Sequence, residues 1–354
     1  MDVDSQKCMG CGATLKYTPA TQNWKCEYCG SEFTIEDIEK YQEQSKLRSE
    51  AESKNISIDE GHTSDKEFDS YTCKNCGAEL ITDGNTVATS CVYCKSTAII
   101  NNRIKGVLLP NKLIPFTKTK DDAIKAFKSC TKGKLFAPSA FTDIKNLQEI
   151  SGVYVPFWLY DSKVEADFQA KGTKITSWSS GDYHYTKTDL YDVIRSCNME
   201  FEKVPADSSS KFEDDLMDSI EPYNYDDLKE FNSAYLSGFL AEKYDVTKEE
   251  ASKRMENRVA NSAIDECKTS ARGYSSLTPQ LQNVKITKGT ISYVMLPVWM
   301  LNIKYKNKLY HFAMNGTTGK FIGEIPMDGG KAFLYTMLFA LGILALGCLF
   351  CLFF

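Results

Sequence analysis

Apolar and polar residues alternate along two long parts of the chain. The alternation runs from about Val153 to Val204, and it returns from Val284 to about Pro326, where Val, Tyr, Phe and Thr are frequent. A period of two with these residue types is typical of antiparallel strands that have one buried face. The dipeptide Asn315-Gly316 interrupts the second part and predicts a tight turn between strands.

Apolar residues recur at helical spacing in other segments. Two such segments begin at capping-box patterns, in which a Thr precedes an acidic residue by three positions. The first pattern, Thr119 with Asp122, predicts a helix that ends near Gly133, and the second, Thr247 with Glu250, predicts a longer helix. A third stretch, from Leu228 to Phe239, shows the same spacing without such a cap. The mixture of helices and strands predicts an α+β fold in which an antiparallel, β-rich domain carries inserted helices.

The last 23 residues, 332–354, are apolar and carry no charge. As a helix they would extend about 34 Å, which exceeds the hydrocarbon thickness of about 30 Å. A buried helix of a soluble core is the alternative, but the segment has no polar face. We therefore expect a single C-terminal transmembrane anchor. Lys320 and Lys331 on its near side favour a cytoplasmic location for the bulk of the chain, at the cell membrane.

Eight of the thirteen cysteines form two copies of one pattern. In each copy two C-x2-C pairs are separated by fourteen residues, a spacer long enough for a short β-hairpin that returns the second pair to the first. Four thiolates in two close pairs are the ligand set of a tetrahedral zinc site. The sequence therefore predicts two zinc ribbons that hold two structural Zn²⁺ ions. The predicted ligands are Cys8, Cys11, Cys26 and Cys29 in the first ribbon, and Cys73, Cys76, Cys91 and Cys94 in the second.

A disulfide framework is the other interpretation of such quartets. The chain opens with MDVDSQK and shows no apolar signal segment behind it, so we expect a reducing compartment in which the thiols remain available for metal. Gly12 and Gly77 follow the second cysteine of a pair, where a positive φ turns backbone N–H groups towards the thiolates. A site closed by four cysteines has no open position, so the expected role of zinc is structural.

The segment between the ribbons is acidic. Residues 36–69 carry 5 basic and 11 acidic side chains, and Thr34 with Asp37 predicts a short helix that leads into a flexible linker. An acidic neighbourhood repels a phosphate backbone, which argues against nucleic acid as the partner.

The sequence offers little for catalysis. The three histidines match no metalloenzyme spacing, and no nucleotide-binding or hydrolase motif is present. Asp161, Glu165 and Asp167 could share one face of a strand, which we interpret as its solvated side. The remaining cysteines before the apolar tail read as single thiols used in packing: Cys130, Cys197 and Cys267.

Two apolar strands share a Pro-x-Trp pattern, at Pro156 with Trp158 and at Pro297 with Trp299. A pair of aromatic ligand contacts is one interpretation. We favour two related strand pairs that bury both indoles in one core.

Taken in order, the ribbons, the VPFW strand, the block from Ser210 to Val246, the LPVW strand and the apolar terminus resemble a known family. The chain resembles bacterial membrane-anchored zinc-ribbon proteins of the TFIIB type, some of which carry a primosomal-helicase-like label. The resemblance implies a zinc-bearing cytoplasmic domain that recruits soluble partners during envelope stress. It implies zinc binding by the eight cysteines and no catalytic residue, and the helicase label has no nucleotide-binding motif to support it.

We expect five parts: a ribbon at 1–35, a linker at 36–69, a second ribbon at 70–105, the α+β domain at 106–328 and the anchor at 329–354. The expected function is that of a non-enzymatic, membrane-tethered adaptor, with the bilayer bound through 332–354 and soluble proteins bound by the ribbons. Nucleic-acid binding by the ribbons is the main alternative, and redox or metal sensing is a third.

Overall fold

The computed structural model describes most of the chain in two compact units. Described are residues 8–11, 13, 15–52, 68–73, 76–82, 93, 99–104, 109–141, 147, 149–211, 214–287 and 289–353. Unit one comprises Met1–Val155, Lys211–Lys243 and Met295–Phe354, and unit two comprises Pro156–Ser210 and Tyr244–Val294. Both units mix helices with largely antiparallel sheet, so the expected α+β class is confirmed.

Unit one begins with a small three-stranded sheet followed by a helix. Strands β1 (Leu15–Thr18) and β2 (Asn23–Cys26) form an antiparallel hairpin, and β3 (Glu32–Phe33) pairs with β2. Helix α1 (Ile35–Glu52) starts at the predicted cap, where Thr34 and Asp37 bond to each other's backbone N–H at 3.3 and 3.0 Å. The β1–β2 hairpin is the one that the fourteen-residue spacer between the cysteine pairs predicted.

A second set of strands in unit one surrounds Cys73. Strand β4 (Phe68–Cys73) pairs antiparallel with both β5 (Glu79–Thr82) and β6 (Ile99–Ile104). Strand β5 also pairs with β11 (Leu240–Glu242), and β11 lies parallel to the first residues of β8 (Ser151–Ser180). The strands that carry the first half of the second cysteine quartet are thus part of the main sheet of unit one.

The core of unit one is built around stacked aromatic rings. Phe116 stacks on Phe239 at 4.2 Å between centroids, and Tyr154 and Trp299 each meet Phe116 edge-on at 5.1 Å. All four side chains are buried. They come from segments that lie far apart in the sequence, so this cluster joins the parts of unit one together.

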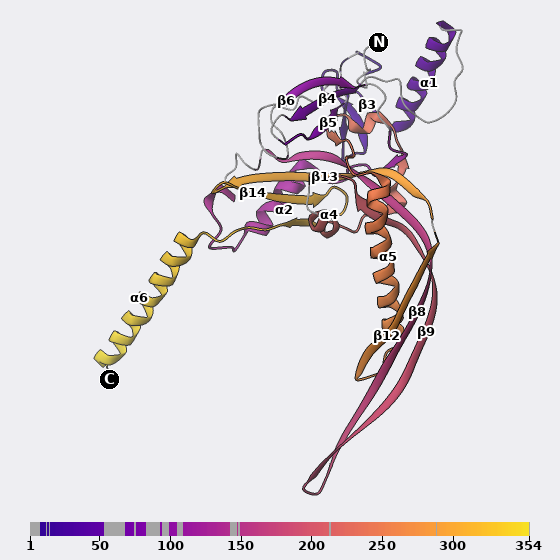
Figure 1. Ribbon diagram of the computed structural model, residues 1–354. Helices are drawn as coiled ribbons and strands as arrows, with labels where there is room; N and C mark the ends of the chain where they lie inside the picture. The colour runs from indigo at the N-terminus through magenta and orange to yellow at the C-terminus, as the bar shows by residue number, and fades with distance from the viewer. Residues whose placement is uncertain are drawn as a thin grey trace. The chain divides into compact units, whose positions relative to one another are not determined.

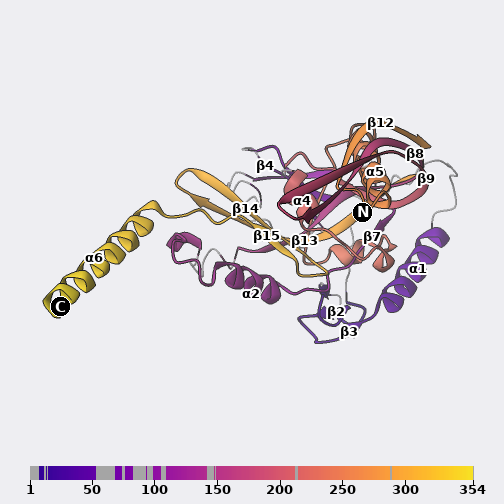
Figure 2. The ribbon, with the colours of Figure 1, turned by 90° about the horizontal axis from the view of Figure 1, so that it is seen from below.

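The remaining elements of unit one are strands β13 to β15, helix α2 and several short pieces. Strand β14 (Lys308–Asn315) pairs with the end of β13 (Ile291–Tyr305) and with β15 (Phe321–Gly323). Helix α2 (Lys120–Thr131) has the predicted capping box and lies beside β15 (Figure 2). Its Phe127 packs against Phe321 of β15. The predicted turn at Asn315 is present, because its Oδ1 accepts the N–H groups of Thr317 and Thr318. The short pieces are β7 (Lys112–Leu113), β10 (Lys229–Glu230), α4 (Asp214–Ser219) and 3₁₀ turns at Ser139–Phe141, Tyr225–Asp227 and Ser233–Leu236.

The helical spacing from Leu228 to Phe239 was misleading. This segment forms strand β10 and the 3₁₀ turn Ser233–Leu236, and it lies between the 3₁₀ turn Tyr225–Asp227 and strand β11. The side chains of Asn224 and Asn232 accept the N–H two residues further on, which caps short turns in place of a continuous helix. Gly238 then takes a φ of 89°, which a helix cannot continue through.

Unit two is a long antiparallel ribbon covered by one helix (Figure 1). Strand β8 pairs with β9 (Tyr183–Asp207) on one edge and with β12 (Ser276–Thr287) on the other. Helix α5 (Lys248–Ser270) packs its buried stripe against β9 and β12. Val164, Ala166 and Phe168 are buried while Glu165 and Asp167 are exposed, so these two acids mark the solvated side as predicted. Asp161 does not fit this prediction, because it is half-buried and its Oδ1 accepts the N–H of Lys203 at 2.7 Å.

The two Pro-x-Trp strands bury their indoles among different side chains. Trp158 lies in unit two and packs on Tyr244 and Tyr293, whereas Trp299 lies in the aromatic cluster of unit one. Each indole N–H donates to a backbone carbonyl, of Val246 and Lys118 respectively. Both side chains are buried, so packing is their role.

Helix α6 (Gly329–Phe353) ends the described chain. Its start is fixed to unit one, because Asp328 Oδ1 accepts the N–H of Gly330 and Lys331 Nζ donates to the carbonyl of Ala137. Within the residues whose side chains are described, no helix is found that combines the length and the apolarity needed to cross a membrane.

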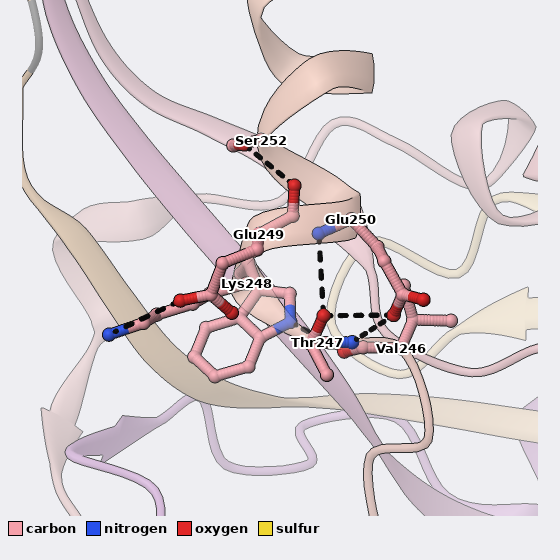
Figure 3. A network of polar contacts seen from close by, with 7 residues as sticks. Val246, Thr247, Lys248, Glu249, Glu250 and Ser252 are labelled. Carbon is pink, nitrogen blue, oxygen red and sulfur yellow. Dashed lines mark hydrogen bonds and ion pairs between the residues drawn. The ribbon is translucent and has the colours of Figure 1, made fainter.

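The capping box of α5 is a reciprocal pair of hydrogen bonds (Figure 3). Thr247 Oγ1 accepts the N–H of Glu250 at 3.4 Å, and the Glu250 carboxylate accepts the N–H of Thr247 at 2.9 Å. We predict that Thr247→Ala destabilises the start of α5 by about 1 kcal/mol. Hydrogen exchange of the first helical turn measures this, with the exposed Lys253→Ala as the control that leaves protection unchanged.

The same cap predicts a pH dependence. Hydrogen bonds from the backbone and side chain of Thr247 lower the pKa of Glu250 below its ordinary value. The stabilisation is therefore present above the unfolded pKa and is lost as the pH falls through the lower folded pKa. Protection factors in the first turn should fall over this acidic range in the wild type and stay level in Glu250→Gln. Equal pH profiles for the two proteins would contradict the assignment.

Candidate metal centre

Four cysteine side chains converge at the turns of the first hairpin. Cys8 and Cys11 precede β1, Cys26 ends β2, and Cys29 lies in the turn before β3. Because the β1–β2 register pairs Leu15 with Cys26, the end of the hairpin returns beside its start. The local strand pairing therefore brings the two C-x2-C pairs together.

The sulfur positions match a tetrahedral metal site. The Sγ atoms of Cys8 and Cys29 lie 3.5 Å apart, those of Cys11 and Cys26 lie 3.6 Å apart, and all four fall within 4.8 Å of one another. Metal–sulfur bonds of about 2.3 Å in a tetrahedron give sulfur separations of about 3.8 Å. The group could therefore hold one metal ion, and four thiolates leave no coordination position for a substrate.

The thiols of the cluster differ in pKa when no metal is bound. Hydrogen bonds from the side chain and backbone of Ser31 and from neighbouring thiols lower the pKa of Cys29 to about 6. A hydrogen bond from the backbone of Ala13 lowers the pKa of Cys11, but desolvation and the three other thiols outweigh it and raise that pKa to about 12. Four thiolates so close together repel one another, and a divalent cation removes that penalty.

Two buried aromatic residues dock the hairpin on the rest of unit one. Trp24 donates its indole N–H to the carbonyl of Ala234 at 2.8 Å, and Tyr17 donates its hydroxyl to the carbonyl of Phe116 at 3.3 Å. Both rings also pack on Tyr235, with centroids 4.9 and 5.4 Å away. The apolar face of the hairpin is thus used for docking, and the cysteine cluster lies at the hairpin's open end, where β1 begins and β2 ends.

The second quartet is only partly described. Cys73 is buried and Cys76 half-buried, whereas Cys91 and Cys94 lie outside the described residues, as does Gly12. The turn after Cys73 repeats the turn after Cys26. In each, the cysteine N–H donates to the carbonyl five residues on, and the N–H of a glycine, Gly77 or Gly30, donates back to the cysteine carbonyl at 2.8 or 2.9 Å. The two glycines have φ values of 70° and 76°, as predicted for Gly77.

The tyrosines at equivalent positions of the two cysteine quartets have opposite environments. Tyr28, between Cys26 and Cys29, is 85% exposed, whereas Tyr93, between Cys91 and Cys94 in the sequence, is 4% exposed. The carbonyl of Tyr93 accepts a hydrogen bond from Asn302 Nδ2 at 2.8 Å, so Tyr93 is packed against β13. Sequence similarity between the copies gave no sign of this difference.

Not all the remaining thiols are single. Cys130 lies on α2, with the amine of Lys134 3.9 Å from its sulfur. Cys197 of β9 and Cys267 of α5, however, bring their Sγ atoms to 2.9 Å, so the expectation of two separate packing thiols was wrong. Strand β9 and helix α5 meet only in the folded unit, so sequence spacing carried no signal for this pair.

Comparison with known proteins finds a full-length relative. The chain is 36% identical over 327 residues to a protein of Bacillus subtilis (strain 168) named "uncharacterized protein YdjG", and the match covers 92% of this chain and 91% of the relative. The chain belongs to the YdjG family. No family model matches the chain, and no solved structure matches it. The match to YdjG covers nearly the whole of both chains, and the name of that relative assigns it no activity.

The cluster geometry predicts the effect of removing one ligand. Cys26 is fully buried, and its backbone N–H and carbonyl are both hydrogen-bonded within the turn, to Ser31 and Gly30. Cys26→Ser should therefore abolish tight metal binding at this site. Elemental analysis of the purified full-length protein should show one metal ion fewer per chain. Cys130→Ser is the matched control and should keep the wild-type content; an unchanged content in Cys26→Ser would contradict the assignment.

Proposed function

We propose that this YdjG-family protein is a non-enzymatic zinc-ribbon adaptor, tethered to the cell membrane, that recruits soluble proteins to the cytoplasmic face. The observation that carries the proposal is the closed four-cysteine cluster on a docked hairpin with an exposed aromatic tip. Such a cluster stabilises a small module and presents it, and it offers no site for chemistry. A role in envelope stress is suggested by the resemblance to membrane-anchored zinc-ribbon proteins.

The proposal assigns one Zn²⁺ to each ribbon. Cys-rich tetrahedral sites favour zinc among common divalent ions. For the second ion, support comes from the turn after Cys73, which matches that after Cys26, and from strand pairing. The register places Cys73 beside Ile99, which follows Cys94 by five residues in the sequence. All eight cysteines, Cys91 and Cys94 included, then serve as structural ligands.

The membrane tether is the uncharged segment 332–354, most of which lies in α6. Large apolar side chains along this helix are exposed, among them Phe333 at 72% and Phe339 at 73%. Exposure of so many apolar groups is costly in water and favourable in lipid. Lys331 at the start of the helix is held by unit one, which supports placing the bulk of the protein on the side of the positive charges.

The partner surface that we propose is the turn around Tyr28. Aromatic side chains that are exposed on a rigid support are frequent anchors of protein interfaces. The neighbouring lysines are paired with acids, Lys16 with Glu27 at 2.9 Å and Lys25 with Glu32 at 3.3 Å. Lysines that are already paired are poorly placed to neutralise phosphates, which favours a protein partner over nucleic acid.

The test is affinity purification of the full-length protein from detergent-solubilised native membranes, with nuclease added to half of the samples. Tyr28→Ala should retain its metal and lose specific partners that wild type retains after nuclease. Tyr183→Ala, which removes another highly exposed tyrosine from the β8–β9 tip, is the matched control and should retain them. Partners that disappear on nuclease treatment, or that bind Tyr28→Ala equally well, would overturn the adaptor proposal.

The tether has a separate prediction. A chain that ends at Asp328 should move from the membrane fraction to the soluble fraction and keep its metal content. Within the intact chain, Leu341→Arg with Leu344→Arg should reduce membrane retention, because a charge at the centre of a span costs about 3 kcal/mol on insertion scales. Retention of both variants in the membrane fraction would contradict the tether.

A further inference from the structure

A second pair of thiols lies in unit two, in elements that have no part in the metal centre. Cys197 is on β9 and Cys267 is on α5, 70 positions later in the chain. Their sulfurs are 2.9 Å apart, closer than the cysteine pairs of the metal cluster at 3.5 and 3.6 Å. A disulfide bond is about 2.04 Å long, so a movement of about one ångström would join the two sulfurs.

The two thiols differ in accessibility. Cys197 is half-buried, whereas Cys267 is fully buried at the end of the stripe by which α5 packs on β9 and β12. Burial first, and then the hydrogen bond with Cys197 and nearby acids, raise the pKa of Cys267 to about 12. Cys267 therefore stays a thiol, and Cys197 is the sulfur that a small reagent meets first.

We propose that Cys197 and Cys267 form a reversible disulfide when the protein meets a hydroperoxide. The Cys197 thiolate attacks one peroxide oxygen, the O–O bond breaks, and the products are a sulfenic acid and, after protonation, water or an alcohol. The Cys267 sulfur then attacks the sulfenic sulfur, its proton leaves with the hydroxyl as water, and the S–S bond forms. The two thiols lose two electrons in total and the peroxide gains them. A thiol reductant reverses the step.

The disulfide would fix the far end of α5. Near its beginning the helix is held by Arg254, whose guanidinium bonds Asp207 at 2.7 Å, and by Arg258, which donates to the carbonyl of Pro205 at 2.7 Å. Near its end the described contacts to β9 include the cysteine pair. Oxidation would replace a packing contact there by a covalent bond, which limits the separation of α5 from the ribbon. This inference does not depend on the adaptor proposal or on zinc.

The test treats the full-length, metal-loaded protein with a small excess of hydrogen peroxide, blocks free thiols and maps linked peptides by mass spectrometry without reduction. We expect one crosslink between the peptides that contain Cys197 and Cys267, its loss on reduction, and an unchanged metal content. Hydrogen exchange in the last turns of α5 should slow at least several-fold on oxidation. Cys130→Ser should behave as the wild type, and Cys197→Ser should lose both effects.

The mapping in the wild type decides the question even if a variant folds poorly. Recovery of Cys197 and Cys267 as separately blocked or over-oxidised thiols would overturn the proposal. Crosslinks from either residue to a cysteine of the metal centre, formed as the metal is released, would also overturn it.

Discussion

The convergence of four sulfurs within 4.8 Å is the constraint on which the first ribbon depends. The hairpin contributes Tyr17 and Trp24 to an interface with unit one and has few apolar side chains left for a core of its own. A bound metal would supply the missing crosslink, since binding energy becomes folding energy in modules of this size. Tyr28 lies between two of these cysteines, so the cluster also determines where its exposed side chain is held.

The two cysteine quartets share a sequence pattern, but their described parts have different surroundings. Both have the same turn after a C-x2-C pair, with a glycine at positive φ. The first exposes Tyr28 at its tip, whereas the second has a buried Tyr93 and strands that continue into the sheet of unit one. Tyr28 is thus exposed on the hairpin whose four sulfurs converge, and this hairpin is itself anchored through Tyr17 and Trp24, which fits the proposed binding role.

Local chemistry was predictable from the sequence, and tertiary contacts were not. The caps at Thr119 and Thr247 and the alternating strands were predicted correctly, because side chains within a few residues determine them. The stretch from Leu228 to Phe239 has helical spacing, yet it forms strand β10, which pairs with β7, and a 3₁₀ turn capped by Asn232. Trp158 and Trp299 look alike in sequence but enter different units. In the candidate site, the first cysteine cluster could be predicted from spacing, whereas the contrast between Tyr28 and Tyr93 and the approach of Cys197 to Cys267 arise only on folding.

X-ray absorption at the zinc edge, combined with metal counting on the full-length protein, tests the central claim most directly. The account predicts two zinc ions per chain, each surrounded by four sulfurs at about 2.3 Å, with no nitrogen or oxygen ligand. A single zinc ion would remove the second ribbon from the account. A protein without zinc, or a zinc shell that includes water or imidazole, would contradict the structural role on which the adaptor proposal is built.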